Sequence, residues 1–578
     1  MATARFRPTD VAPVLAQLHG YSRRALGRDL LAAFSIAAAL VPQGLAYGTV
    51  AGLPPVAGLY TALGAALVFS LVTSTRFVVV GPSSTLALMT FEAVHGRAAG
   101  DPARAVALAG CLAVLVGLLC VISPLMRMQR ISDLLSGPVM LGYLAGAGIV
   151  IVVGQLGVLL GVPAGGERAL AKLWSVISHV DQAHVVTAVV GVSAVVLILL
   201  LKRYVPRVPA SLVVLLMAAL ATVVLDLADH GVAVVGTVTG GLPTPGLPAV
   251  TGADVKALLP FAGGMALIAV AETVSAIRKT TDPQGERVSF GREGAALGAA
   301  SVASGVLGGF APMGSASRSL SARSAGAHSQ LFQVGIVAIV LFALVSGGPI
   351  FARMPLAVLA ATLLALSVPR LIDVPGFLRL WRGWRAEALV ALVTAVAVVG
   401  LGVLNGLLVA VALAAGQLLR RAAHPHDAVL GVTSPDQPPH EINENQLPGS
   451  SVLIYRVDAS LFFANAGGVA ERIRGLAATC GPDLRYVILD AEAMSYLDAT
   501  AAETIAQLTV DLRGRGCELL LARVRPPVLA ALRANPYGQG ATRALPAFPS
   551  VRQANAHAEE KLALQRGTAG HDPQRPGG

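Results

Sequence analysis

The sequence predicts a polytopic α-helical membrane protein of about fourteen spans, followed by a small cytoplasmic α/β domain. Two observations support this prediction. Of the 578 residues, 55% are hydrophobic and only 13% are charged, which is about half the charged share of a soluble domain. The polarity also changes along the chain, because apolar runs with short polar breaks fill residues 30–421 and ordinary polarity returns from residue 451. This composition excludes an ordinary cytosolic enzyme, a disordered chain and a nucleic-acid-binding protein.

Composition divides the chain into five segments. These are a cytoplasmic N-terminal segment (1–29), a transmembrane domain (30–421), a linker rich in Pro, Asp and Asn (422–450), an α/β domain (451–566) and a disordered tail (567–578). The N-terminal segment is not a secretory signal, because Arg23, Arg24 and Arg28 precede the first apolar run and further spans follow it without a cleavage site. We interpret it as a basic cytoplasmic anchor.

The fourteen spans follow from the length of the apolar runs, since a helix needs about 20 apolar residues to cross a bilayer. We place them at 30–48, 56–72, 82–95, 103–124, 133–160, 184–201, 210–228, 257–278, 293–310, 313–328, 330–347, 355–369, 385–403 and 404–421. Several are too short to cross alone, above all 82–95 and 313–328.

The placement of positive charge tests this count. If residue 1 is cytoplasmic, the polar segments between spans on the cytoplasmic side, together with the N-terminal segment, hold 21 Lys and Arg residues. Those on the opposite side of the membrane hold six. This asymmetry predicts an even number of spans and an integral protein of the plasma (inner) membrane with both termini in the cytoplasm. The net charge of +11 is therefore topological, and we expect no nucleic-acid partner.

Two of the short spans begin in the same unusual way. The third span begins VVVGPSSTLALMT (78–90) and the tenth GGFAPMGSASRSLSA (308–322), each with Gly and Pro before a Ser-rich start. Paired spans of this kind mark the binding site of inverted-repeat transporters. A helix that starts in mid-membrane directs unpaired N–H groups and its positive dipole end into a cavity, so two facing starts form an anion site. The hydroxyl donors at these starts are Ser83, Ser84, Thr85, Ser315 and Ser317. The alternative is that the small residues only allow close helix packing.

The same motifs carry a family resemblance. PQGLAYGTVAGLPPVAGLYTAL (42–63) resembles the first-span signature of the SulP family of anion transporters, and GPSS (81–84) and GSASRS (314–319) resemble its third and tenth spans. VLIYRVDASLFFANA (452–466) and VILDAEAMSYLDAT (487–500) are similar to the family's cytoplasmic STAS domain. The resemblance covers residues 25–555, in the family's order.

The resemblance implies a fourteen-span, seven-plus-seven inverted repeat with a core domain and a gate domain. It places the anion between the starts of the third and tenth spans. By position, Gln43 and Tyr47 of the first span then line the site, Ser83 lies at the start of the third span, and Ser317 and Arg318 lie at the tenth. The resemblance also implies elevator-like movement of the core and a homodimer.

Physical arguments support some of these residues independently. Arg318 is a cation inside the membrane, which is costly unless it is paired or faces a wet cavity, so it is a functional candidate. The alternative interpretation is that Arg318 has a structural role and pairs with a carboxylate or with the carbonyl groups at a helix end. Gln43 and Tyr47 are four residues apart and share a helix face. The alternative interpretation is that Gln43 and Tyr47 only form hydrogen bonds between helices.

Glu272 lies well inside the eighth span and is the most deeply embedded acid that the sequence offers, since Glu92, Asp226 and Glu293 lie nearer span ends. A lone carboxylate in a low dielectric can take and release a proton near neutral pH, as proton relays do. Members of the resembled family that are driven by protons or sodium also carry an acid here. Ala276 stands where the sodium-coupled members have Thr, which favours a proton over sodium. The structural alternative is an ion pair between Glu272 and Arg318.

The C-terminal part reads as a sheet covered by helices. VLIYRV, YVILD and CELLLAR predict buried strands, and the segments beginning at residues 466, 499 and 526 predict helices. No motif indicates catalysis, a cofactor or a metal site. Thr500 is a candidate phosphoacceptor because a phosphate suits a helix N-terminus. The simpler interpretation is that Asp498 and Thr500 cap the helix.

We therefore predict a secondary active transporter of a small inorganic or organic anion, with sulfate or bicarbonate as the leading substrates and dicarboxylates as a third option. The predicted partners are the anion, a proton, membrane lipid, a second copy of the chain and a cytoplasmic protein at the STAS domain. The alternatives are a passive anion channel, an anion exchanger, and a membrane sensor that signals through the STAS domain.

Overall fold

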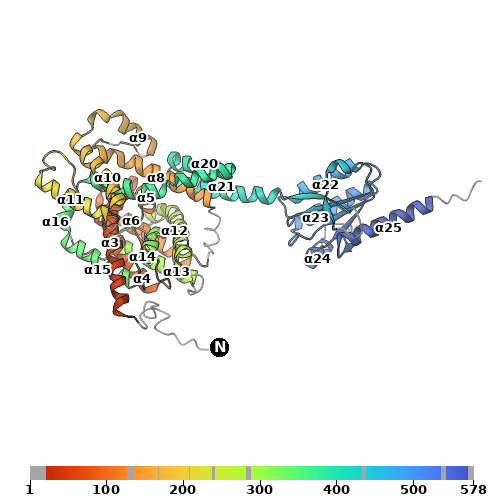
Figure 1. The fold of residues 1–578 in the computed structure, drawn as a ribbon, viewed down its shortest axis with the longest axis horizontal. Coiled ribbons are helices and arrows are strands. Elements are labelled where there is room, and N and C mark those ends of the chain that lie inside the picture. Colours follow the sequence, from red (N-terminus) through yellow and green to blue (C-terminus); the bar gives the residue numbers. More distant parts are fainter. Residues whose placement is uncertain are drawn as a thin grey trace, which may run out of the picture. The chain divides into compact units, whose positions relative to one another are not determined.

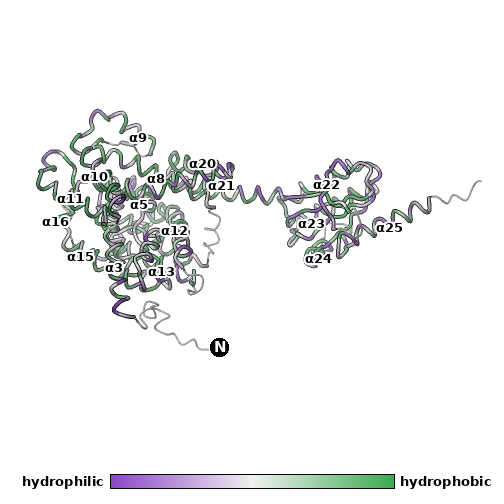
Figure 2. Tube along the Cα trace, in the orientation of Figure 1, coloured by the Kyte–Doolittle hydropathy of each residue, from purple (hydrophilic) through white to green (hydrophobic). Residues whose placement is uncertain are grey.

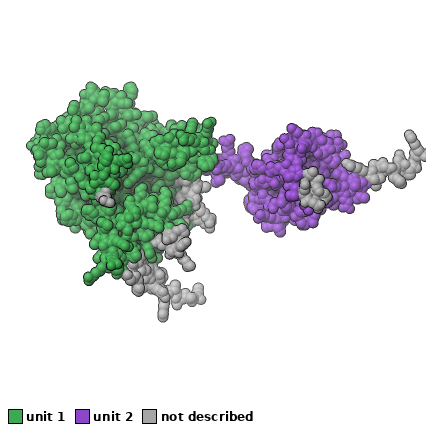
Figure 3. Space-filling model, in the orientation of Figure 1, with its two compact units in different colours: residues 1–414 green, residues 415–578 purple. Residues whose placement is uncertain are grey.

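A computed structural model describes residues 21–125, 136–163, 165–166, 168–206, 208–236, 241–281, 288–432, 438–534, 542–543 and 545–569. The chain forms two compact units, residues 1–414 and 415–578 (Figure 1, Figure 3). Most of the predicted cytoplasmic N-terminal segment (1–20) and most of the predicted disordered tail (570–578) lie outside the described residues.

Unit 1 is helical, and each of the fourteen predicted spans coincides with a helix. In chain order these helices are α3 (Arg23–Val50), α4 (Val56–Val72), α5 (Ser84–Ala98), α6 (Pro102–Ile122), α8 (Gly137–Leu160), α10 (Val185–Tyr204), α11 (Ala210–Val224), α12 (Gly252–Thr280), α13 (Phe290–Val306), α14 (Ala316–Ser324), α15 (Leu331–Ser346), α17 (Leu356–Leu366), α20 (Arg385–Leu401) and α21 (Val403–Ala423). Apolar residues dominate these helices (Figure 2). Within the described residues, seven helical stretches are long and apolar enough to cross a membrane by length and composition.

Within the described residues, four shorter α-helices connect the spans: α9 (Ala169–Ser178), α16 (Gly348–Ala352), α18 (Val368–Leu371) and α19 (Val374–Gly383). α19 carries the sequence VPGFLRLWRG and buries none of its residues. Its apolar side chains are exposed next to Arg379 and Arg382, which is the pattern of a helix that lies in the membrane interface.

The helix contacts show the two-fold internal repeat. The second helix of the second half, α13, packs on the fourth helix of the first half, α6; reciprocally, α15 packs on α4. In the same way α20 packs on α8, and α10 packs on α17. This exchange of partners is what two halves related by an inverted repeat produce. It separates a core group (α3–α6 and α12–α15) from a gate group (α8, α10, α11, α17, α20 and α21).

Glycines permit the closest of these contacts. A Cβ added at Gly117 of α6 would lie 2.6 Å from the carbonyl oxygen of Gly298 on α13, and one at Gly298 would lie 2.5 Å from that of Gly117. Any larger residue at either position would push the helices apart. The high glycine content of the chain therefore serves helix packing here, as is common in membranes.

Unit 2 contains a six-stranded sheet in the order β4-β3-β5-β6-β7-β8. The parallel strands are β5 (Val452–Val457), β6 (Tyr486–Asp490), β7 (Glu518–Ala522) and β8 (Ala547–Phe548). Helices α22 (Ala466–Cys480), α23 (Ala499–Gly514) and α24 (Pro526–Ala534) cover one face, and α25 (Val551–Ala569) covers the other. Alternate side chains of the parallel strands enter the two apolar clusters, so the strands are buried on both faces, as in other parallel sheets.

The segment 422–450, which the sequence predicts to be a linker, adds two strands to this sheet. β3 (Asp427–Gly431) pairs antiparallel with β5, and β4 (His440–Glu441) pairs with β3. Val429 and Leu430 of β3 are buried on opposite faces of the sheet. The folded unit therefore begins inside the predicted linker, because β3 covers the edge that β5 would otherwise expose.

Candidate functional site

The starts of α5 and α14 are joined by a short antiparallel strand pair. β1 (Val80–Gly81) leads into α5, and β2 (Met313–Gly314) leads into α14. Val80 pairs with Gly314, and Gly81 pairs with Met313. The structure thus brings together the two motifs that the sequence singles out, although they lie more than 200 residues apart.

Serine caps both helices. The Ser83 Oγ accepts a hydrogen bond from the Leu86 N–H at 3.3 Å, and the Ser315 Oγ accepts one from the Arg318 N–H at 3.4 Å. The N-terminal ends of both helices carry partial positive charge. Two such ends next to one strand pair make a region of positive potential that suits an anion.

Arg318 links the two starts directly. Its Nη1 donates a hydrogen bond to the carbonyl oxygen of Pro82 at 3.0 Å. Its Nε is buried without a hydrogen-bond partner among the described residues. No carboxylate in the described part of the chain forms an ion pair with it, so the ion pair with Glu272 that the sequence left open is absent. The guanidinium therefore keeps its positive charge uncompensated between the two helix starts.

Gln43 and Tyr47 of α3 are buried. The Tyr47 hydroxyl lies 2.9 Å from the Ser367 Oγ, which precedes α18. This bond joins the core group to the gate group. Gln43, one turn before Tyr47, is 4% exposed.

The hydroxyls at the two starts differ in their surroundings. Ser83, Ser84 and Thr85 are buried, and the Thr85 Oγ1 has no hydrogen-bond partner among the described residues. Ser315 is half-buried, whereas the side chain of Ser317 is exposed. The donors that face an enclosed environment therefore belong mostly to α5.

Glu272 lies half-buried on α12, next to the residue that holds β2 in place. The Oγ1 of Thr273 accepts a hydrogen bond from the Gly314 N–H at 3.0 Å and donates one to the Ala269 carbonyl at 2.6 Å. A Cβ added at Gly314 would lie 2.8 Å from the Thr273 Oγ1, so glycine is required for this close approach. Thr273, the residue after Glu272, therefore holds the strand that leads into α14.

Sequence reasoning missed the residues that support these starts. Thr273 is one, and Ser319 is another, since its Oγ accepts a hydrogen bond from the Val79 N–H at 2.9 Å. Gln330 and Gln333 donate to the Val78 carbonyl at 3.3 and 3.2 Å. The one sequence signal that could have identified these residues is that they are polar side chains within apolar segments.

Two carboxylates of unit 1, among its described residues, are more deeply buried than Glu272. Asp29 is 1% exposed and accepts hydrogen bonds from Tyr21, His328 and Ser329. Glu293 is 2% exposed and accepts hydrogen bonds from Thr73 and Ser74. Both are satisfied in local networks at helix ends, which makes them structural.

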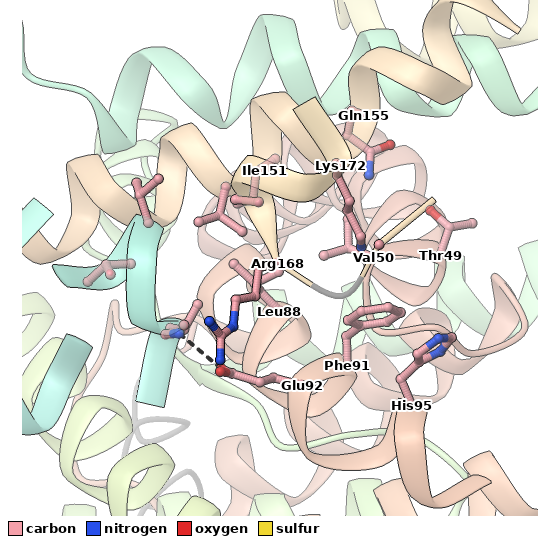
Figure 4. Close-up of a pocket in the computed structure, with 18 of the residues that line it drawn as sticks. Thr49, Val50, Leu88, Phe91, Glu92, His95, Ile151, Gln155, Arg168 and Lys172 are labelled. Atoms are coloured by element: carbon pink, nitrogen blue, oxygen red, sulfur yellow. Dashed lines mark hydrogen bonds between the residues drawn. The ribbon is translucent and has the colours of Figure 1, made fainter. Parts of the chain in front are cut away.

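A cavity of about 740 Å³ lies at the other end of α5 (Figure 4). Core helices α3 and α5 line it on one side, and α8, α9, α17, α20 and α21 line it on the other. Glu92, Arg168 and Lys172 supply its charges.

In unit 2, Asp498 caps α23. Its Oδ1 accepts a hydrogen bond from the Ala501 N–H at 2.8 Å, and its Oδ2 accepts one from the Phe463 N–H at 2.8 Å. Thr500 is exposed on the first turn. Among the described residues, no group of three or more His, Cys, Asp or Glu side chains is arranged to hold a metal ion.

Comparison with known proteins now defines the class. Residues 26–394 match the sulfate permease family, and residues 445–554 match the STAS domain. A probable sulfate transporter of Mycobacterium tuberculosis is 37% identical over 527 residues, which cover 90% of this chain and 94% of that protein. Human solute carrier family 26 member 6 is 30% identical over 507 residues, which cover 82% of this chain and 66% of that protein.

Solved structures show the same fold. The murine solute carrier 26 family member A9 anion transporter, in its inward-facing state, matches with a TM-score of 0.86 at 20% identity over 97% of this chain and 96% of that one. The transmembrane domain of the cyanobacterial bicarbonate transporter BicA matches with a TM-score of 0.61 at 21% identity, over 68% of this chain and 98% of that one.

The chain belongs to the sulfate permease family, a family of anion transporters, and carries a C-terminal STAS domain. It is an integral membrane protein with a polytopic helical core, which confirms the predicted fold.

Proposed function

We propose that this chain is a secondary active transporter that carries sulfate, with bicarbonate as the second candidate and dicarboxylates as the third, by symport with protons. The observation that carries the proposal is Arg318, an uncompensated cation that bridges the starts of α5 and α14. The names of its relatives support sulfate, and the likeness to a bicarbonate transporter supports the second candidate.

The anion binds between the two helix starts. The Arg318 guanidinium and the N–H groups of both first turns supply the positive potential. Gln43, Tyr47, Ser83, Ser84, Ser315 and Ser317 complete the proposed lining. Because the donors are N–H and O–H groups, they select charge and shape and suit a tetrahedral or trigonal oxyanion.

Glu272 carries the coupled proton. Its side chain is half-buried inside an apolar helix, so it remains accessible for proton exchange. A neutral Glu272 adds no negative charge to the core group that binds the anion, which favours anion binding. An ionised Glu272 opposes it, because like charges in a low dielectric repel strongly.

Transport then proceeds by movement of the core group against the gate group, in an elevator-like manner, within a homodimer in the plasma (inner) membrane. Both termini lie in the cytoplasm, since the positive charges concentrate on that side. The STAS domain supports or regulates the dimer and docks cytoplasmic partners, and Thr500 is its candidate phosphoacceptor.

The test is uptake of labelled sulfate and of labelled bicarbonate into proteoliposomes under an imposed proton or sodium gradient. We expect an inward proton gradient to drive accumulation of sulfate, and Glu272→Gln to abolish that accumulation while anion exchange persists. Glu293→Gln is unsuitable as a control because its carboxylate holds a helix end. Asp101→Asn at the start of α6 serves instead, because asparagine keeps the Oδ1 acceptor of the cap and removes only the charge. Anion flux that does not depend on either gradient would indicate an exchanger or a channel. Proton-driven accumulation in the Glu272→Gln variant would show that Glu272 does not couple protons to transport.

A further inference from the structure

A carboxylate of the core group caps a helix of the gate group. α20 ends at Leu401, and α21 starts again at Val403. The Glu92 Oε2 accepts hydrogen bonds from the Val403 N–H at 3.0 Å and from the Leu404 N–H at 3.2 Å (Figure 4). Glu92 lies on α5, the helix whose other end carries Ser83 and the proposed anion site.

The local sequence is arranged to receive this side chain. A helix is usually capped by the residue that precedes it, but that residue here is Gly402, which has no side chain. Gly402 has a φ of +95°, and a Cβ added there would lie 2.1 Å from the Glu92 Oε1. Gly402 thus leaves both the capping position and the space for a side chain to Glu92, which lies 311 positions before the Val403 that it caps.

The contact borders the 740 Å³ cavity, which gives solutes and protons access to it. The charged or titratable groups that line this cavity with Glu92 are His95 on α5 and Arg168 and Lys172 from α9 and its start. Tyr143 on α8 lies within electrostatic reach of both Glu92 and Glu272 on α12. Arg168 points toward Glu92 (Figure 4), and the Lys172 Nζ lies 4.6 Å from the centre of the Phe91 ring. α3, α17, α20 and the first turn of α21 contribute no titratable group to the cavity wall.

We propose that Glu92 is a positioning residue of transport: its ionised carboxylate fastens the core to the gate, and a proton that enters from the cavity releases it. The proposal rests on the proposed function only in requiring that the core moves against the gate. In that movement α5 shifts relative to α21, so the two hydrogen bonds must break.

The release follows from the chemistry of the cap. An ionised carboxylate is attracted to the positive end of the α21 dipole and accepts strong, charge-assisted hydrogen bonds. A protonated carboxyl loses the charge and keeps only the weaker acceptor oxygen. Glu92 therefore acts at the core–gate contact, whereas Glu272 acts at the anion, and the two carboxylates have separate readouts.

Cross-linking of the core to the gate tests this proposal without requiring transport. A Cβ at Gly264 of α12 would lie 2.7 Å from the Leu404 Cδ1 on α21, so the pair Gly264→Cys and Leu404→Cys reports the closed contact. The four native cysteines are buried and can remain, and the chain without the pair serves as the blank. The rate of disulfide formation is measured in membranes between about pH 8 and pH 5.

We expect Glu92→Ala to slow cross-linking at least threefold at pH 8. Glu92→Gln keeps an acceptor oxygen but cannot titrate. At each pH the cross-linking rate of the chain with Glu92 is divided by that of the Glu92→Gln chain, which removes the effect of pH on the thiols themselves. That ratio should fall at least threefold on acidification. Asp101→Ala, the counterpart of Glu92→Ala, removes the side-chain cap of α6 within the core group and should leave the rate unchanged.

The proposal is overturned if Glu92→Ala cross-links as fast as the parent, if the ratio stays constant with pH, or if Asp101→Ala slows the reaction equally. Each variant is first checked for a monodisperse peak in detergent, and Glu92→Gln, which preserves the acceptor, covers the case in which Glu92→Ala fails to fold. If Glu272→Gln leaves proton-driven uptake intact while the ratio still falls with acid, the proposed coupling fails and the role of Glu92 stands.

Discussion

Arg318 is the residue on which the chemistry of the site depends. Its contact with the Pro82 carbonyl ties α14 to the start of α5, and its unpartnered Nε shows that the protein alone does not satisfy the guanidinium. Leaving a buried donor unpaired is costly, and an oxyanion would supply the missing acceptor. Gly81 lies against it, since a Cβ there would be 3.6 Å from the Arg318 Nη1, so the strand and the cation are fitted to one another.

At this scale we predict that Arg318→Gln lowers sulfate uptake at least about tenfold, because each hydrogen bond to a charged group contributes roughly 1.5–3 kcal/mol. The matched control is Arg323→Gln on the same helix, whose guanidinium donates to the Thr280 carbonyl at 2.9 Å and not to the site. Initial rates of labelled sulfate uptake at equal protein content provide the measurement. Equal losses in both variants would show that Arg318 acts only by holding α14.

Among the elements, the two half-helices and α23 share one device, a side-chain cap at a helix N-terminus. Ser83 and Ser315 cap α5 and α14, which leaves the remaining first-turn N–H groups for an anion. In α23 the carboxylate of Asp498 takes the Ala501 N–H and also fixes the loop after β5 through the Phe463 N–H. A side-chain cap at a helix N-terminus therefore leaves N–H groups for a ligand in unit 1, and it holds the loop after β5 in place in unit 2.

At the scale of the element we predict that Asp498→Ala destabilises the STAS domain by about 1–2 kcal/mol, since a lost cap costs roughly that much. Thr500→Ala should change the stability by less than about 0.5 kcal/mol, because its side chain is exposed. The readout is labelling of Cys480 and Cys517, which are buried and react only when the domain opens. Burial also raises the pKa of both thiols, which keeps the closed state unreactive. Equal labelling of Asp498→Ala and the parent would contradict the cap.

For the whole molecule, the two units have independent apolar cores. The large cluster of unit 1 is built from residues between Ala32 and Leu407, and the clusters on the two faces of the sheet in unit 2 are built from residues between Ala428 and Leu562. No residue of the sheet is needed to complete the cluster of unit 1. Each unit therefore has an apolar core of its own, although the helix α21 crosses their boundary.

We accordingly predict that a chain ending at Ala423 inserts, stays monodisperse in detergent and keeps proton-driven sulfate uptake within about fivefold of the full chain. The control is the same truncated chain with an unrelated soluble domain fused after Ala423, which shows whether any soluble domain can replace the STAS domain. Aggregation of both the truncated chain and this control would show that unit 1 depends on the STAS domain.

The sequence by itself determined which segments are helices and which sit in the membrane, because the apolar runs have the length that the bilayer imposes and side-chain polarity is a local property. It also singled out GPSS and GSASRS, since Gly, Pro and Ser interrupt two otherwise apolar spans. The tertiary structure alone decided that Val80 pairs with Gly314, that Thr273 holds β2, that Glu92 caps α21 and that β3 lies in the sheet. Each of these is a contact between backbone groups and side chains far apart in the chain, and no local pattern encodes which distant carboxylate will meet an uncapped helix.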